Sequence, residues 1–298
     1  PVYVNGTPCE LGYLSGLRAF REARSRMGLA RGYRFLHELH GDSRVPAYLS
    51  TIVDANDEAK AILTSQRAGL PAYLDQGRFW TYAIALSQRR APRAEPVTGV
   101  SIRTGDDIGA HAIAAFLNRV GPARQFFPVV NAGDFGTPYL RGLAAADFMV
   151  ALSGDRMIGA VAKWDQSAFK QVHVCGYSRR AGLLRNSVNL ALKATGYAPL
   201  PSPGSDLRIF YAAFPCIEGD DPAILHVLLE RLYEQNRYAG YHSFAIGFHE
   251  HDPLSHGLRG FLKFEYESRL YVVAWEDGKP FTDTLDEGRG PHLEPATL

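Results

Sequence analysis

The sequence predicts an α/β protein built from two units. Its 298 residues exceed the usual length of one domain and fit two. Short apolar runs of strand length alternate with stretches of helical apolar spacing, and both halves show the order strand, helix, strand, helix, strand. The longest apolar runs, such as 210–214 and 271–275, fall well short of the roughly 20 residues that cross a bilayer. We therefore expect two ordinary hydrophobic cores and no membrane span.

The first unit is predicted over residues 1–90. Asn5-Gly6 is typical of the tight turn of a hairpin, and Gly41 follows a stretch with helical spacing as a stop. The elements expected here are a hairpin over 1–18, a helix over 29–40, a strand over 47–53, a helix from Asp54-Ala55-Asn56 to near Gly69, and a strand over 79–86.

The second unit is predicted over residues 97–280, after a polar linker with two prolines at 87–97. Ser153-Gly154-Asp155-Arg156 predicts a hairpin turn. Past Glu276, the Gly, Pro and acidic residues predict a loose tail. The elements expected are strands over 101–104, 148–152, 157–164, 207–214, 243–248 and 267–275, helices over 106–120, 223–238 and 257–261, and a helical patch at 188–194.

Composition limits the classes of partner. Lys and Arg number 32 against 31 for Asp and Glu, so the net charge of +1 gives no global reason to expect nucleic acid or an acidic membrane as partner. Cys9, Cys175 and Cys216 are widely spaced and odd in number, which argues against a disulfide framework or a thiolate metal cluster. A reducing cytoplasm is the simplest compartment. Because the chain opens at Pro1, an upstream signal stays open.

Residues 11–18, followed by Ser25-Arg26-Met27-Gly28-Leu29-Ala30-Arg31-Gly32, resemble the central strand and following loop and helix of the GCN5-related N-acetyltransferases. The family signature there is Gln/Arg-x-x-Gly-x-Gly/Ala. Gly28 and Ala30 match it, whereas Ser25 takes the leading basic position. In the family the next strand leads to an Asn that starts a helix with Ala three residues later, as Asn56 and Ala59 do here.

The resemblance covers most of residues 1–86, as the later half of such a domain, and residues 98–276 by the order of elements. It implies two units, each a mixed, mostly antiparallel twisted sheet flanked by helices. By the same analogy, the first strands of the first unit would precede Pro1.

The resemblance also implies acetyl-CoA or another acyl-CoA as cosubstrate of the first unit. Free N–H groups and the dipole at a helix start suit a diphosphate, and Gly28 and Ala30 allow close approach. An ordinary strand-to-helix turn is the alternative, and Asn56 taken alone is simplest as a helix cap. The expected CoA-binding residues are Leu17, Arg18, Ala19, Arg26, Met27, Gly28, Leu29, Ala30, Arg31 and Asn56.

The corresponding loop of the second unit, residues 215–222, carries Glu218, Asp220 and Asp221. Three carboxylates would repel a diphosphate. The second unit is therefore expected to be a degenerate copy without a CoA of its own.

Catalytic residues are less well marked. The family's usual acid is a Tyr on the helix after the Asn, but residues 62–65 read Ile-Leu-Thr-Ser. Tyr13 and Tyr73 are the candidate replacements, with a place in the core or at the rim as the alternative for each. Glu10 is a conceivable base, although it alternates to the strand face opposite Tyr13.

The expected function is N-acylation of an unidentified amine, on a small molecule or a peptide, with no nucleic-acid or membrane partner. The alternative is a noncatalytic acyl-CoA-binding or interaction protein. A metal-dependent hydrolase ranks third, because His249, His251 and His256 match no metal motif. Asp252 is interpreted as a helix cap and Pro253 as a first-turn residue, so no metal is expected.

Overall fold

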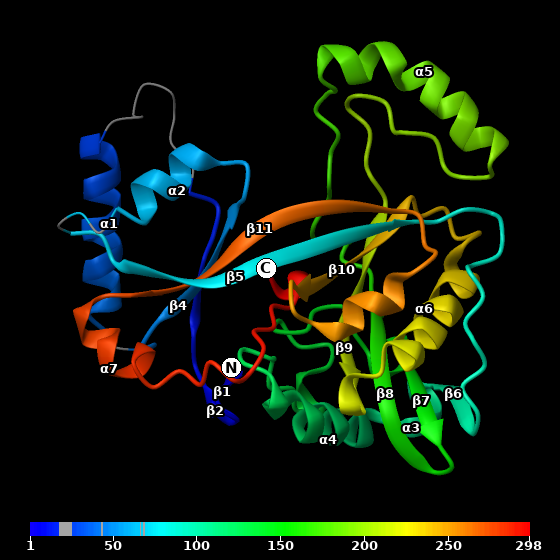
Figure 1. The fold of residues 1–298 in the computed structure, drawn as a ribbon, viewed down its shortest axis with the longest axis horizontal. Helices are drawn as coiled ribbons and strands as arrows, with labels where there is room; N and C mark the ends of the chain where they lie inside the picture. The colour runs from blue at the N-terminus through cyan, green and yellow to red at the C-terminus, as the bar shows by residue number, and fades with distance from the viewer. Residues whose placement is uncertain (18–25, 43, 66, 68) are drawn as a thin grey trace.

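The structure is a computed structural model that describes residues 1–17, 26–42, 44–65, 67 and 69–298, with only the backbone of Arg26 and Met27 (Figure 1). The strands are β1 (Val2–Val4), β2 (Thr7–Cys9), β3 (Gly12–Leu14), β4 (Tyr48–Val53), β5 (Ala72–Ala85), β6 (Val100–Thr104), β7 (Phe148–Ser153), β8 (Arg156–Trp164), β9 (Ile209–Ile217), β10 (Ser243–His249) and β11 (Lys263–Ala274). The helices are α1 (Arg26–His40), α2 (Asp57–Leu63), α3 (Gly105–Ile108), α4 (Ala110–Val120), α5 (Arg179–Ala194), α6 (Pro222–Asn236) and α7 (Lys279–Thr282).

Short-range patterns in the sequence predicted most of these elements. The chain starts with the expected hairpin, in which Asn5 and Gly6 have φ angles of 53° and 81°. Positive φ at both turn residues matches the twist of the flanking strands. β1 and β2 form a small sheet of their own, and β3 lies in the main sheet. The hairpin predicted at Gly154-Asp155 joins β7 to β8, as expected.

Among the described residues, the main sheet has nine strands in the order β3-β4-β11-β5-β10-β9-β8-β7-β6. Six neighbouring strands, β3-β4-β11-β5-β10-β9, form a symmetric set. If each strand is replaced by its counterpart from the other half and the list is then read backwards, the order is unchanged. β3 then matches β9, β4 matches β10, and β5 matches β11. The second half continues with β8, β7 and β6, which have no first-half counterparts among the described strands. That residues 1–86 form only the later half of a unit stays a prediction.

The two halves exchange strands. β5 ends the first half but lies between β10 and β11, and β11 comes from the second half but lies between β4 and β5. The two pair antiparallel from Lys263↔Ile84 to Ala274↔Ala72 and form the long ribbon across the middle of Figure 1. The division into separate domains at 1–90 and 97–280 stays a prediction, but the sheet is continuous across it.

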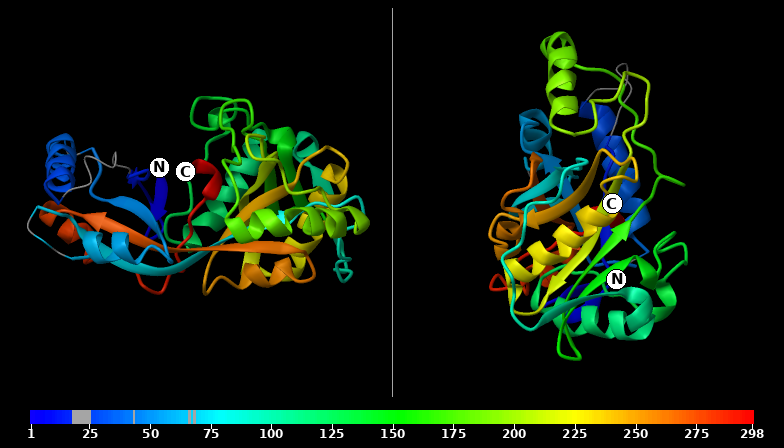
Figure 2. Two further views of the ribbon diagram at one scale, coloured as in Figure 1. Left: turned by 90° about the horizontal axis from the view of Figure 1, so that it is seen from above. Right: turned by 90° about the vertical axis from the view of Figure 1, so that its right-hand side faces the viewer.

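Helices cover both faces of the sheet (Figures 1 and 2). In the first half, Tyr33 of α1 and Leu63 of α2 pack with Ile52 and Val273 on one face. In the second half, α6 covers one face and α4 the other. The buried residues of α6, such as Leu225, Leu228 and Leu232, recur at helical spacing. No helix among the described residues is long and apolar enough to cross a bilayer.

Two expectations need correction. The tail past Glu276 is not loose, because residues 292–296 are buried. The Gly, Pro and acidic residues that suggested a loose tail precede this short segment, whose own burial depends on strands distant in sequence. The polar stretch 87–97 is also anchored, since the N–H groups of Ala91 and Ala94 donate to Glu234 and Glu230 of α6.

Candidate functional site

The parallel strands β3 and β4 of the first half stop pairing after Leu14, and we call the place where their pairing ends the first wedge. The strands pair from Gly12↔Tyr48 to Leu14↔Ser50, where the Ser50 hydroxyl donates to the Leu14 carbonyl at 2.9 Å. β3 ends at this point, while β4 runs on to Val53. The following residues turn to solvent: Leu17 is 62% exposed, and a Cβ on Gly16 would meet open space.

The helix that follows this wedge begins with the predicted Gly28 and Ala30 in its first turns. α1 has no acidic residue in its first turn, so no carboxylate of the helix itself offsets the positive end of its dipole. Leu29 is half-buried against the sheet, whereas Ala30 and Arg31 are exposed. The predicted Arg18 and Ala19 lie outside the described residues.

Asn56 lies at the junction between β4 and α2. Its side-chain oxygen accepts the Ala59 N–H at 3.1 Å, so the prediction of a helix cap is confirmed. The first turn of α2 carries Asp57 and Glu58, which also suit a helix start. The oxygen of Asn56 is thus already engaged within the protein.

The matching wedge of the second half, between β9 and β10, is closed. The strands pair in parallel only from Ser243↔Ile209 to Ala245↔Tyr211. Beyond that point β9 pairs with β8 and β10 with β5. The buried tail enters the gap, and a Cβ on Gly247 of β10 would lie 2.6 Å from the ring of Pro295.

Glu294 fixes the tail to β9. Its carboxylate accepts the Phe214 N–H at 2.6 Å and the Ala296 N–H at 3.0 Å. Phe214 has a φ of 52° at the point where the β8–β9 register shifts, so its N–H turns out of the ladder. Burial raises the pKa of Glu294 to about 7. The tail therefore takes up a backbone donor that a bulged strand otherwise offers to a ligand.

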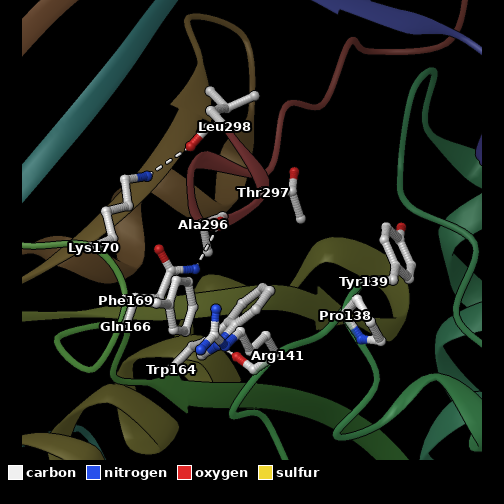
Figure 3. A pocket seen from close by; sticks show the side chains of 10 residues that line it. All are labelled: Pro138, Tyr139, Arg141, Trp164, Gln166, Phe169, Lys170, Ala296, Thr297 and Leu298. Carbon is white, nitrogen blue, oxygen red and sulfur yellow. Dashed lines mark hydrogen bonds between the residues drawn. The ribbon is translucent and has the colours of Figure 1, made fainter.

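The tail ends beside a cavity of about 200 Å³ (Figure 3). Gln166 donates to the Ala296 carbonyl and Lys170 to the Leu298 carbonyl, each at 2.6 Å. Burial raises the pKa of Tyr139, at the opposite wall, to about 12. The tail itself forms one wall of this cavity, which belongs to the closed wedge.

The loop after β9 is held by its own charges. Glu218 pairs with Arg119 and Arg156, and its pKa is lowered, first by the hydrogen bond from Arg119. The side chain of Asp221 caps α6 by accepting the Ala223 N–H at 2.8 Å. A carboxylate thus already occupies the helix start at which a diphosphate would bind.

A buried cation links this loop to the next one. Arg124 contacts Asp220 and Asp252 at 2.5 Å each, and Arg124 and Asp252 are both largely buried. Removing one carboxylate would leave the buried charge of Arg124 without that partner, which costs free energy. The three residues therefore hold the two loops together.

Comparison with solved structures identifies the fold. A structure from Sphaerobacter thermophilus, described as a GCN5-related N-acetyltransferase, is similar with a TM-score of 0.51 and 12% identity over 85% of this chain and 69% of that chain. This chain has the GCN5-related N-acetyltransferase fold. Structures with the same description from Kribbella flavida and Anabaena variabilis give TM-scores of 0.45 and 0.43 at 14% and 10% identity. They match 91% and 90% of this chain, which spans 54% and 56% of theirs. No family model and no curated protein matches.

Within this acetyltransferase fold, the two candidate tyrosines lie on opposite faces of the sheet. Tyr13 packs with Leu49 and its hydroxyl lies 2.9 Å from that of Thr51. Tyr73 packs on the helix-covered face, 2.6 Å from the hydroxyl of Tyr33. Burial raises the pKa of both, so both are protonated at neutral pH. The structure does not bring them into one site.

The histidine-rich segment is structural in this fold. Asp252 caps a short helix by accepting the Leu254 N–H, with Pro253 in its first turn, as predicted. His249 bonds the Gln76 carbonyl at 2.8 Å. Among the described residues, no group of three or more potential ligands is placed to hold a metal ion.

Sequence reasoning missed the tail and its contacts with Phe214 and Gly247. One signal was present in the sequence: a glycine inside the buried strand 243–249 indicates close approach of another segment. The strand sequence does not indicate that the approaching segment is the tail.

Proposed function

We propose that this chain is an acyl-CoA-dependent N-acyltransferase whose first half binds the acyl-CoA, with acetyl-CoA as the expected cosubstrate. One observation carries the proposal. The second of the two related wedges is filled by the tail. At the first, the described residues Gly16 and Leu17 are exposed, and α1 begins with Gly28 and Ala30 in its first turns and no acid in the first turn. Such a helix start suits a diphosphate.

The chemistry expected at this wedge is attack of an amine nitrogen on the thioester carbonyl. The amine loses a proton to a base, and the thiolate leaves and takes up a proton. Tyr13 is the better candidate acid, because it lies on β3 next to the wedge. A small-molecule or peptide amine is the expected acceptor.

The test compares two glycines of α1. Gly28→Val should lower acetyl-CoA affinity at least about tenfold, since each lost hydrogen bond to a charged group costs about 1.5–3 kcal/mol. Gly32→Val is the matched control: it lies one turn further along the same helix, its Cβ would meet open space, and it carries the same helix-propensity cost. Isothermal titration calorimetry measures both.

A second control addresses the other half. Gly219 has a φ of 72°, which Asn tolerates, so Gly219→Asn should leave acetyl-CoA affinity unchanged. Equal losses in Gly28→Val and Gly32→Val, or a loss from Gly219→Asn alone, would place the cosubstrate elsewhere. Absence of binding by the unmodified protein at millimolar acetyl-CoA would remove the proposal.

A noncatalytic acyl-CoA-binding protein is the second candidate. It is favoured by the missing tyrosine on α2 and by the engagement of the Tyr13 and Tyr73 hydroxyls within the protein. Release of free CoA thiol that depends on an added amine distinguishes the two. The reducing cytoplasm stays the proposed compartment, supported by three free cysteines.

A further inference from the structure

Between β8 and β9 the chain makes a long excursion. The two strands pair antiparallel as neighbours, and such strands need only a two-residue turn. Here residues 165–208 lie between them and carry α5. We call residues 166–205 the α5 arm. Figures 1 and 2 show α5 standing away from the sheet and the other helices.

α5 turns its polar side toward the protein. Asn189 exchanges two hydrogen bonds with the Leu200 backbone, at 2.7 and 3.4 Å. Arg185 donates to the Leu200 carbonyl at 3.2 Å and to Ser202 at 3.0 Å. Hydrogen bonds to the segment of the arm that follows α5 therefore hold this face of the helix. No residue of α5 is buried.

The leucines of α5 point the other way. Leu183 is 83% exposed, Leu190 72%, Leu184 60% and Val188 39%. At 100° per residue these positions share an arc of about 160° that faces away from Arg185 and Asn189. A surface helix normally buries its apolar side, so this one presents an apolar face to a partner.

The charge of the arm specifies that partner. Residues 166–205 contain five Lys or Arg and no Asp or Glu, with Asp165 and Asp206 just outside this range, whereas the whole chain has a net charge of +1. The rest of the chain therefore carries −4. Arg179, Arg180 and Lys193 are exposed on α5 itself. Leucines flanked by basic residues without acids are typical of helices that lie on anionic lipid surfaces.

Other occupants fit less well. A second copy of α5, in either orientation, would bring basic residues against basic residues. A partner protein with an apolar groove would also have to place acidic residues opposite Arg179, Arg180 and Lys193. A lipid surface needs only the apolar face and the flanking cations. We propose that, contrary to the expectation from the net charge of the whole chain, the α5 arm docks the protein on an anionic membrane surface.

The whole chain is tested by cosedimentation with vesicles of phosphatidylcholine, with or without phosphatidylglycerol. Binding is expected only with the anionic lipid and should weaken with salt. Leu183→Ser/Leu190→Ser should lower the partition coefficient at least about tenfold. The matched control is Phe35→Ser/Leu39→Ser, two exposed apolar residues on α1, which should not change it.

Charge is tested separately. Arg179→Gln/Arg180→Gln/Lys193→Gln should weaken binding by about fivefold per residue. Arg90→Gln/Arg93→Gln/Arg103→Gln removes the same charge from exposed residues elsewhere and should have little effect. Circular dichroism of each variant checks that the helix content is kept.

Four results would overturn the proposal. Equal binding to both vesicle types would show that the anionic lipid is not recognised. Equal losses in the test and control variants would show that the α5 arm is not the binding surface. No vesicle binding at low salt would point to an acidic protein as partner. Self-association that Leu183→Ser/Leu190→Ser abolishes, seen by sedimentation without lipid, would assign the face to a second copy. Acetyl-CoA binding is measured independently and bears only on the proposed function.

Discussion

His292 and Glu294 show how single buried residues make the stability of this protein depend on pH. Both are fully buried, and the His292 Nε2 lies 4.0 Å from a Glu294 oxygen. Burial lowers the pKa of His292 to about 3, with a further contribution from Arg124, and raises that of Glu294 to about 7. Both are therefore neutral in the folded protein in mildly acidic solution.

The two groups act in opposite directions. The unfolded chain protonates His292 near the ordinary histidine pKa of 6.5, so that residue's contribution to stability is lost as pH falls from 6.5 toward 3. The unfolded chain ionises Glu294 near 4.5, so its contribution is present below 4.5 and lost as pH rises toward 7. Between pH 4.5 and 6.5 the effects nearly cancel.

We predict that His292→Phe exposes the Glu294 effect. Phenylalanine keeps the ring contact with Phe127, whose centroid lies 4.8 Å from that of His292. The variant's free energy of unfolding should fall by up to about 3 kcal/mol from pH 4.5 to 7, while that of the unmodified protein stays nearly level. Urea unfolding across this range measures both. Parallel profiles would show that His292 does not titrate as its burial implies.

At the scale of elements, β5 carries a bulge that fits it to β10. The β5–β11 register shifts between Arg78↔Arg269 and Asp75↔Tyr271, so Gln76 and Gly77 together oppose one residue. Gly77 has a φ of 95°, and a Cβ there would lie 2.5 Å from His249. Only glycine fits both conditions.

Gly77→Ala should therefore destabilise the protein by about 1–3 kcal/mol, through a strained backbone and a displaced His249. Gly133→Ala is the control, because its Cβ would meet open space and its φ is not positive. It should change stability by less than about 0.5 kcal/mol. Thermal unfolding compares the two. An unchanged midpoint for Gly77→Ala would mean that the bulge relaxes without cost.

At the scale of the whole molecule, the exchanged strands join the two halves. β11 pairs with β4 over six residues and with β5 along nearly its full length. Loss of β5 from the first half would expose the edges of β10 and β11, and loss of β11 from the second half would expose the edges of β4 and β5. Chains of this length often unfold in several steps, but this sheet favours a single one.

We expect coincident unfolding of the two halves. Trp275 stacks on His40 in the first half, and Trp164 is buried in the second. Variants that keep one of these tryptophans, with the other two tryptophans replaced by phenylalanine, should give the same denaturant midpoint by fluorescence. Two separate midpoints would show that the halves unfold independently. Gly77→Ala should lower both midpoints together.

Features that depend on near neighbours along the chain could be predicted from the amino-acid sequence. The turn at Asn5-Gly6, the caps at Asn56 and Asp252, and the existence of most strands and helices rest on interactions within a few residues. The acidic second loop was also readable, because its charges are adjacent in sequence.

How these elements combine became known from the folded structure. The exchange of β5 and β11 joins strands about 190 residues apart, and the Glu294 carboxylate meets Phe214 across 80 residues. Hydrophobic periodicity tells which face of a strand is buried but not which strand lies beside it. Likewise, the spacing of the leucines of α5 is typical of a buried helix face, but in the structure these leucines are exposed. The reason is physical: pairing partners are selected by the free energy of the whole packed chain, which no local pattern contains.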